Sequence, residues 1–214
     1  MNLPPKPVMR SDLGRALAAA GERAEDRIID CLIAHLELLA AWNERFHLTA
    51  LNDWPEILDR HLNESLLALR WIGRAGALVD LGSGNGFPAI PILVCRPQLE
   101  GTLVERSENK SVFLEEALSR AGVLGSKILT LDLGMRDAER LGRVFDVVTS
   151  RATMAPRQLL ILAARLIRPR GRIFLYSNRA DAEKAIHESG SPLTCLAQET
   201  IPGRKDSVLF VLEG

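Results

Sequence analysis

The stretch VDLGSGNGFPAIP, residues 79–91, decides the fold of this chain. An apolar run, ALVDL (77–81), leads directly into a loop in which Gly82, Gly84 and Gly86 alternate with small polar residues. Glycine permits positive φ and removes the Cβ atoms that would keep a ligand away from the backbone. Pro88 suits the first turn of a following helix. The stretch therefore predicts a strand, a loop shaped for a ligand and a helix.

Similar apolar runs follow along the chain, and helical patterns separate them. The runs are GTLVE (101–105), KILTL (127–131), FDVVTS (145–150) and GRIFLY (171–176), and the helical patterns cover 88–95, 108–121, 156–168 and 180–188. This alternation predicts an α/β fold with a doubly wound, mostly parallel, Rossmann-like sheet. SVLFVL (207–212) follows TCLAQETI and a PGRKD turn, which indicates a C-terminal antiparallel hairpin.

The first part of the chain has a different pattern. Apolar residues recur at helical spacing over residues 22–42 and again over 55–71, and residues 1–14 are expected to form a loose arm. We therefore expect an N-terminal helical segment, residues 1–75, and a sheet domain, residues 76–214. The sequence leaves open whether the first part is a separate domain or a cap.

Composition excludes several classes of protein. The 214 residues are 47% hydrophobic and 25% charged, with a formal net charge of zero, and no apolar run is long enough for a membrane span. The stretch MNLPPKPVMRSDLG does not resemble a secretory signal, so we expect a cytoplasmic protein, and we expect it to be a monomer. Cys31, Cys95 and Cys195 are far apart, and the four histidines share no ligand spacing, so no metal site is expected.

The spacing of the loop distinguishes between nucleotide ligands. Glu105 ends the second apolar run, where a carboxylate can accept hydrogen bonds from the ribose hydroxyls of an adenosine. Dinucleotide sites use G-x-G-x-x-G, whereas this loop reads G-x-G-x-G with Asp80 before it. A carboxylate there repels phosphate and suits a cationic sulfonium ligand. The pattern resembles motif I of class I S-adenosyl-L-methionine-dependent methyltransferases, which disfavours a nicotinamide oxidoreductase.

Five further stretches carry a closer resemblance. They are WNERFHLTA (42–50), RHLNESL (60–66), VDLGSGNGFPAIPI (79–92), LVERSENKSVFL (103–114) and FDVVTSRA (145–152). In their order and spacing they are similar to the small-subunit (16S) ribosomal RNA guanine-N7 methyltransferase G family, also called glucose-inhibited division protein B. The resemblance covers roughly residues 25–176 and implies methyl transfer from S-adenosyl-L-methionine to N7 of a guanine in 16S rRNA or a small-subunit particle.

The resemblance also implies roles for individual residues. Glu105 would hold the ribose where the family usually has Asp, and Arg151 would lie beside the cofactor and face the target base. Ala138 and Glu139, in MRDAERL, would contact the adenine through the backbone. The full expected cofactor-binding set is Asp80, Gly82, Ser83, Gly84, Gly86, Phe87, Glu105, Ala138, Glu139 and Arg151.

Two departures from the family pattern concern the substrate side. The fifth strand ends in LYSNRAD, without the Lys-Gly that many members have there. In the R-H-x-x-[DE]-S motif, which includes His61 and Ser65, Glu64 replaces the more usual Asp. His61 is kept as a candidate substrate-side residue.

Methylation of guanine N7 requires little from the protein, because N7 carries an exposed lone pair and no proton must be removed. Alignment of the reacting atoms can contribute up to about 7–11 kcal/mol. We therefore expect no general base. Arg151 is expected to donate to guanine O6 or to hold the phosphate of the target nucleotide. The alternative for this arginine is a structural salt bridge to Asp146 or to the region of Asp80.

RNA binding requires local positive charge. Residues 136–172 include nine arginines and three acidic residues, and we expect this stretch to surround the carboxyl ends of the fourth and fifth strands as a phosphate track. Alternatively, Arg165, Arg168, Arg170 and Arg172 cap a helix and stay solvated. Arg204 and Lys205 are weaker candidates for the same role.

Two other functions remain open from the sequence. One is a methyltransferase that acts on a small molecule or a protein, for which an evenly neutral surface would be typical. The other is a non-catalytic protein that binds S-adenosyl-L-methionine as a sensor or scaffold. The intact loop, Glu105 and Arg151 argue against the second function.

Overall fold

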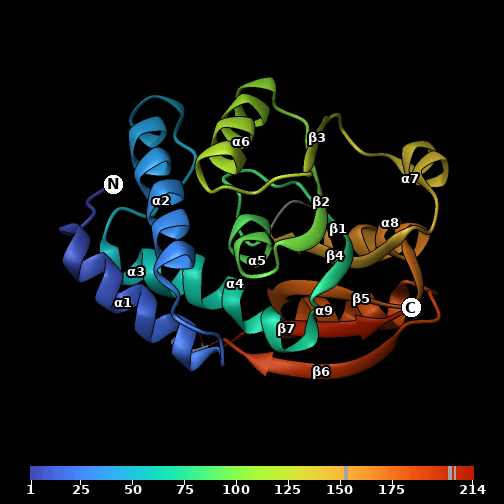
Figure 1. Cartoon of the computed structure of the whole chain (residues 1–214). Coiled ribbons are helices and arrows are strands. Elements are labelled where there is room, and N and C mark those ends of the chain that lie inside the picture. The colour runs from blue at the N-terminus through green and yellow to red at the C-terminus, as the bar shows by residue number, and fades with distance from the viewer. Residues whose placement is uncertain (152–153, 202–203, 205) are drawn as a thin grey trace.

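The computed structural model describes residues 1–151, 154–201, 204 and 206–214, and its centre is one seven-stranded sheet in the order β3-β2-β1-β4-β5-β7-β6 (Figure 1). The strands are β1 (Ala75–Leu81), β2 (Gln98–Glu105), β3 (Lys127–Thr130), β4 (Phe145–Arg151), β5 (Ile167–Asn178), β6 (Thr194–Thr200) and β7 (Ser207–Glu213). Strands β1 to β5 pair in parallel, whereas β7 is antiparallel to both β5 and β6. The predicted fold class, including the C-terminal hairpin, is confirmed.

Helices cover both faces of the sheet. On one face α5 (Ala89–Cys95) and α6 (Glu108–Arg120) pack against β2, and on the other α8 (Pro156–Leu166) and α9 (Arg179–Glu188) pack against β5. Each of these four helices lies within two residues of its predicted position. A further helix, α7 (Met135–Leu141), packs on α8, and the sequence did not predict it.

The N-terminal segment is helical almost throughout. It contains α1 (Lys6–Ala19) and α2 (Asp26–Phe46), followed by a run of changing pitch: α3 (Trp54–Ile57), the π-helix η1 (Leu58–Asn63), α4 (Glu64–Leu67) and the 3₁₀ helix η2 (Ala68–Trp71). In Figure 1 these helices lie on the side of the sheet away from α7 and α8. No helix in the described part of the chain is long and apolar enough to cross a membrane.

The prediction of a loose arm over residues 1–14 is wrong. Helix α1 begins at Lys6 with proline in its first turn, a position where the missing N–H is not needed. Met9, Leu13, Ala16 and Leu17 recur on one face and are buried. The prolines that suggested an irregular arm therefore start a helix, and this apolar face holds the helix against the rest of the molecule.

One hydrophobic core joins the two parts of the chain. Leu13 of α1 and Leu36 of α2 belong to the same buried cluster as Ile90 of α5 and Phe113 of α6. A buried arginine adds polar links between them, since Arg96 donates from Nη2 to Oε1 of Glu22 at 2.6 Å and to the carbonyl oxygen of Leu69 at 3.0 Å. The secondary structure changes character near residue 75, but the core continues across that point.

Candidate functional site

The loop between β1 and α5 is joined to the end of β2 by a carboxylate. Gly82 and Gly84 have φ of 72° and 53°, a left-handed conformation that glycine adopts without strain. The N–H of Gly84 donates to Oε2 of Glu105 at 2.9 Å, and the N–H of Ser107 donates to Oε1 at 2.9 Å. Since each carboxylate oxygen has two lone pairs, Glu105 can still accept hydrogen bonds from a ligand.

Gly86 allows α2 and α5 to pack closely against the loop. A Cβ at this position would lie 2.5 Å from Cδ1 of Ile90 and 2.9 Å from Nε2 of His35. The close approach of α2 to the loop therefore requires glycine here.

A cavity of about 560 Å³ opens beside this loop, and we call it the loop cavity. Six of the residues that the sequence predicts for the cofactor line it, namely Gly82, Ser83, Gly84, Phe87, Glu105 and Arg151. Arg106 and Lys110 add positive charge to its wall. The arrangement combines a glycine-rich backbone, an acceptor carboxylate and an apolar ring in one hollow at the carboxyl edge of the sheet. This is where open α/β sheets bind ligands.

Asp80 lies below the loop and does not line the loop cavity. Its side chain is buried within the sheet, where Oδ1 accepts a hydrogen bond from the Thr149 hydroxyl at 2.6 Å. Its Oδ2 is buried and accepts no hydrogen bond from any residue that the structure describes. Burial raises the pKa of this carboxyl to about 6. A cation bound above the loop would offset this cost of burial.

Ala138 and Glu139 lie away from the loop cavity. Ala138 is packed in the core, and Glu139 is exposed and lies 3.7 Å from Nη1 of Arg165. Leu131, Asp132 and Leu133, which follow β3 directly, line the cavity at that edge. The family resemblance implied that the segment MRDAERL contacts the adenine. In the structure this segment forms α7, which begins after the cavity-lining residues 131–133.

Arg151, at the end of β4, reaches across to the N-terminal segment. Its Nη2 lies 2.8 Å from Nδ1 of His61 and its Nη1 lies 3.5 Å from Oε2 of Glu64. Nη1 also donates to the backbone carbonyl of Arg60. Burial lowers the pKa of Arg151, and Glu64 acts in the opposite direction.

The carboxylate that faces Arg151 was not anticipated. Asp146, one of the partners considered from the sequence, lies 3.0 Å from Arg168 at the other end of β4. The RHLNESL motif was the available signal, because Glu64 and His61 both belong to it. Ala152, which the sequence analysis grouped with Arg151, is outside the described residues, as is Lys205.

The protonation state of His61 follows from its partners. Arginine can only donate, so Nδ1 of His61 must accept and Nε2 must carry the proton in the neutral ring. Nε2 then donates to the Thr49 hydroxyl at 3.1 Å. Burial, and next the charge of Arg151, lower the pKa of His61 to about 2. The imidazole is therefore neutral at physiological pH.

Phe87 is held between two imidazole rings. His61 of η1 stacks on it with centroids 4.5 Å apart and His35 of α2 with centroids 4.6 Å apart. His35 also donates from Nε2 to the carbonyl oxygen of Asn85 at 2.9 Å, and burial lowers its pKa to about 4. Through these contacts the N-terminal helices fix the loop that borders the cavity.

A second cavity, of about 680 Å³, lies between η1, α4 and the carboxyl ends of β4 and β5. Its wall includes Arg60, His61, Glu64, Tyr176 and Arg204. Arg151 and Met154 line both this cavity and the loop cavity. The two hollows are therefore neighbours, and the Arg151 side chain is part of the wall between them.

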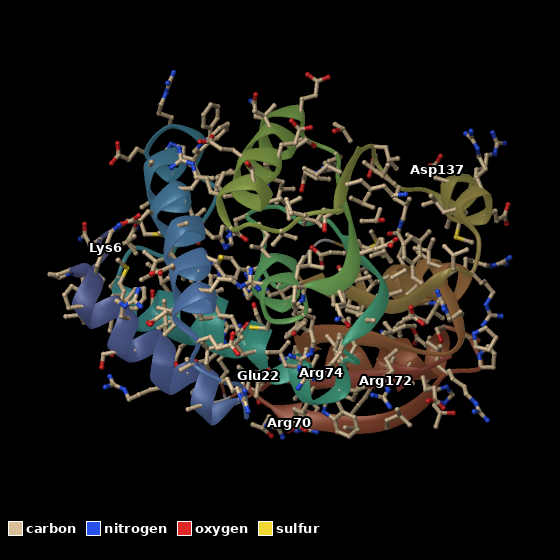
Figure 2. The ribbon with its side chains drawn as sticks, in the orientation of Figure 1. Lys6, Glu22, Arg70, Arg74, Asp137 and Arg172 are labelled. Atoms are coloured by element: carbon tan, nitrogen blue, oxygen red, sulfur yellow. The ribbon has the colours of Figure 1, made fainter. Side chains whose placement is uncertain are left out.

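The prediction that the arginines of residues 136–172 surround the carboxyl ends of β4 and β5 is wrong for most of them. Arg168, Arg170 and Arg172 lie at the beginning of β5, which is the amino edge of the sheet and opposite the cavities. Arg172, which is labelled in Figure 2, donates to the backbone carbonyl of Trp71, in the segment that precedes β1. Of the nine arginines over residues 136–172, Arg151 ends β4, and Arg136 and Arg157 lie in the first turns of the helices that follow β3 and β4, on the carboxyl side of the sheet.

The amino-edge arginines have structural partners. Arg168 pairs with Asp146, Arg172 lies over the ring of Trp71 at 5.8 Å, and Arg143 donates from Nε to the carbonyl of Ile167 at 2.8 Å. Ile167 follows the last residue of α8, so this hydrogen bond caps a helix end. The alternative interpretation of these arginines, as helix-capping and surface residues, agrees better with the structure.

Comparison with known proteins gives matches over most of the chain. The family model described as rRNA small subunit methyltransferase G (GidB) matches residues 28–205. A protein of that name from Chloroflexus aggregans is 34% identical over 190 residues, which cover 83% of this chain and 78% of the relative. One from Roseiflexus sp. is 33% identical over 207 residues, covering 91% and 86%. One from Neisseria gonorrhoeae is 35% identical over 159 residues, covering 74% and 75%.

Solved structures share the fold at low sequence identity. An O-methyltransferase from Bacillus cereus in complex with SAH has a TM-score of 0.61 at 16% identity, over 85% of this chain and 91% of that one. A precorrin-6y C5,15-methyltransferase from Geobacter metallireducens has a TM-score of 0.53 at 13% identity, over 71% and 86%. At these identities the likeness concerns the fold alone.

Proposed function

Because the chain belongs to the rRNA small subunit methyltransferase G family, we propose that it transfers a methyl group from S-adenosyl-L-methionine to N7 of a guanine in 16S ribosomal RNA. The family gives the reaction class and the kind of substrate. The observation that carries the proposal for this chain is the pair of neighbouring cavities whose wall contains Arg151. One cavity has the features of a nucleoside site, and the other can admit a base.

The loop cavity fits S-adenosyl-L-methionine, which supplies the methyl group on a positively charged sulfur. Glu105 would accept from the ribose hydroxyls with the lone pairs that Gly84 and Ser107 leave unused. The buried Asp80 carboxylate below the loop favours a cation above it. Gly82, Ser83 and Phe87 would border the ligand. Gly86 would shape the loop, and a backbone contact of Ala138 and Glu139 with the adenine is part of the proposal as the family resemblance implies it.

No residue has to act as a base. N7 of guanine presents a lone pair and carries no proton, so the protein has to align N7 with the methyl carbon. His61 is the only histidine that lines the second cavity among the described residues, and its Nδ1 already accepts from Arg151. Arg151 would hold the target nucleotide from the wall between the cavities. The ring of Phe87, 5.9 Å from the guanidinium, supports it there.

The phosphate-binding surface is proposed at the carboxyl edge. Arg60 and Arg204 line the second cavity, and Arg106 and Lys110 line the loop cavity. These four cations surround the two cavities, so RNA phosphates beside the target base would meet positive charge.

The substrate would be 16S rRNA or a small-subunit particle, so we propose that the reaction takes place in the cytoplasm. We further propose that one chain acts as a monomer.

Labelled methyl transfer tests the proposal. The purified protein is incubated with methyl-labelled S-adenosyl-L-methionine and with small subunits or 16S rRNA from a strain that lacks the gene. The RNA is then digested, and its nucleosides are separated by mass spectrometry. We expect label in 7-methylguanosine. Label in another nucleoside would overturn the assignment to N7.

A matched control separates RNA from other acceptors. Protein extract and small molecules from the same strain are incubated in parallel, and wild-type particles that already carry the modification serve as a saturated control. Label in protein or small molecules alone would assign the enzyme to a different substrate class.

A further inference from the structure

The second cavity contains a buried carboxylate that methyl transfer itself does not require. Glu64, the first residue of α4, is 4% exposed. Its oxygens lie 3.5 Å from Nη1 of Arg151 and 3.4 Å from Nε of Arg204. Both distances exceed the ~2.7–2.9 Å of a strong charge-assisted hydrogen bond. The two arginines balance the charge of Glu64. Because neither makes a strong hydrogen bond with it, the carboxylate can still accept hydrogen bonds from a ligand.

Two polar atoms of this cavity lack hydrogen-bond partners. Oε1 of Glu64 and the hydroxyl of Tyr176 are buried, and neither makes a hydrogen bond with the part of the chain that the structure describes. Buried polar groups in folded proteins nearly always have partners, and exceptions need an explanation. A ligand that supplies hydrogen-bond donors to the second cavity would provide these partners.

The chemistry of the carboxylate selects among RNA groups. A phosphate would be repelled by Glu64, and uracil offers one ring N–H between two carbonyl oxygens. Adenine and cytosine present an amino group next to an acceptor nitrogen, which would face a carboxylate oxygen unfavourably. Guanine alone presents two neighbouring donors, N1–H and the 2-amino group, that match the two oxygens of a carboxylate.

We propose that Glu64 is the residue that selects guanine, by accepting hydrogen bonds from N1–H and from the 2-amino group of the target base in the second cavity. This inference rests on the proposed function. N7 lies on the opposite side of the purine from these two donors. A guanine bound to Glu64 in this way therefore presents N7 away from the carboxylate and available for the methyl group.

Removal of one donor from the base tests the pairing. Small subunits are reconstituted around semisynthetic 16S rRNA in which inosine, which lacks the 2-amino group, replaces the methylated guanosine. For the wild-type protein, we expect kcat/KM on the inosine particle to fall about tenfold or more. Equal rates on the two particles would overturn the proposal without any variant.

A double-mutant cycle assigns the effect to Glu64. In the Glu64→Gln variant the carboxylate is lost, so we expect the change from guanosine to inosine to alter kcat/KM by less than about twofold. Glu64→Asp keeps a carboxylate and should retain most of the penalty. A penalty of the same size in Glu64→Gln as in the wild type would show that another group reads the amino group.

Two controls identify the cause of any loss of activity. The affinity of each variant for S-adenosylhomocysteine and its circular dichroism report on the loop cavity and the fold. If the wild type forms no 7-methylguanosine on unmodified particles, the proposed function itself fails and this inference fails with it. If it forms 7-methylguanosine but does not distinguish inosine, only the inference about Glu64 fails.

Discussion

Arg151 connects a strand end with the helical segment that faces it. Its guanidinium contacts an imidazole, a backbone carbonyl and a carboxylate, which belong to His61, Arg60 and Glu64. A planar fork with five N–H donors can serve several acceptors at once, whereas a lysine ammonium cannot match these directions. The side chain that borders both cavities is thereby held in one orientation.

We expect Arg151→Ala to lower kcat/KM for methyl transfer at least 100-fold, because the target nucleotide loses its positioning group. The melting temperature should also fall, since the buried charge of Glu64 would lose one of its two cations and keep Arg204 alone, a change that can cost up to about 3–5 kcal/mol. Methyl transfer to small subunits and thermal unfolding by circular dichroism measure the two effects. Undiminished turnover would remove Arg151 from the site.

The double variant Arg151→Ala, Glu64→Gln separates these effects. Neutralising Glu64 removes the buried charge that lost Arg151, so stability should recover at least in part while methyl transfer stays low. Recovery of both would mean that Arg151 acts only on stability.

The two buried histidines make stability depend on pH. Their pKa values in the folded protein, about 4 for His35 and about 2 for His61, lie below the ordinary 6.5. The unfolded chain therefore binds more protons below pH 6.5, and stability falls as the pH falls through this value. Asp80 acts in the opposite direction, because its folded pKa of about 6 lies above its ordinary 3.8. From pH 7 to pH 5 we expect a net loss of about 2 kcal/mol, measured by urea unfolding.

His35→Gln is the matched control for this prediction. Glutamine can donate to the Asn85 carbonyl but does not titrate, so the loss between pH 7 and pH 5 should become small. A variant that retains the full pH dependence would show that other groups cause it.

At the scale of elements, the helical run over residues 54–71 shows what the sequence could and could not predict. Its apolar spacing predicts one helix from residue 55 to 71, and a helical run is present there. The pitch changes inside it, and the π-helical turn η1 carries Arg60 and His61. Such turns are frequent at functional sites, but tertiary contacts decide where they form, so apolar spacing did not reveal this one.

The error about the arginine track has a different origin. In a parallel sheet each crossover helix returns the chain to the amino edge, so residues between a helix and the next strand lie there. Helix α8 ends at Leu166 and β5 begins at Ile167, so Arg168 and Arg170 are at that edge. The order of helices and strands in the sequence thus indicates the edge on which these arginines lie, whereas the local balance of charge does not. By contrast, Gly84 and Glu105 could be paired from sequence because Gly84 follows β1 and Glu105 ends β2, so both lie at the carboxyl edge.

Substitutions at opposite edges test which surface binds RNA. Arg60→Ala and Arg106→Ala should each weaken RNA binding and reduce the dependence of log Kd on log salt concentration by about one. Arg165→Ala, at the amino edge and more than half exposed, is the control and should leave both unchanged. Filter binding over a range of salt concentrations gives the slopes. A larger effect of Arg165→Ala than of the other two would place the RNA at the amino edge.

At the scale of the whole molecule, one hydrophobic core continues across residue 75. Leu36 and Phe113 belong to one buried cluster, and the Glu22–Arg96 ion pair adds a polar link. We therefore propose that the helical segment is a cap that folds together with the sheet.

Cooperativity can be measured with the native tryptophans. Trp42, Trp54 and Trp71 are the three tryptophans of the chain, and all lie before residue 76. Their fluorescence thus reports the helical segment, whereas far-ultraviolet circular dichroism reports the whole chain. We expect the two urea transitions to coincide, as they do for a single cooperative unit. Separate midpoints would show that residues 1–75 form an independent domain.

The wall that Arg151 and Met154 contribute to both cavities has a consequence for inhibitor design. A compound with an adenosyl group at one end and a purine at the other could occupy both hollows through a short linker. The second group would then bind at the high effective concentration that the linker sets. Selectivity over other methyltransferases would come from the purine end, since the glycine loop is a feature of the fold class whereas the N-terminal segment contributes Arg60, His61 and Glu64 to the second cavity.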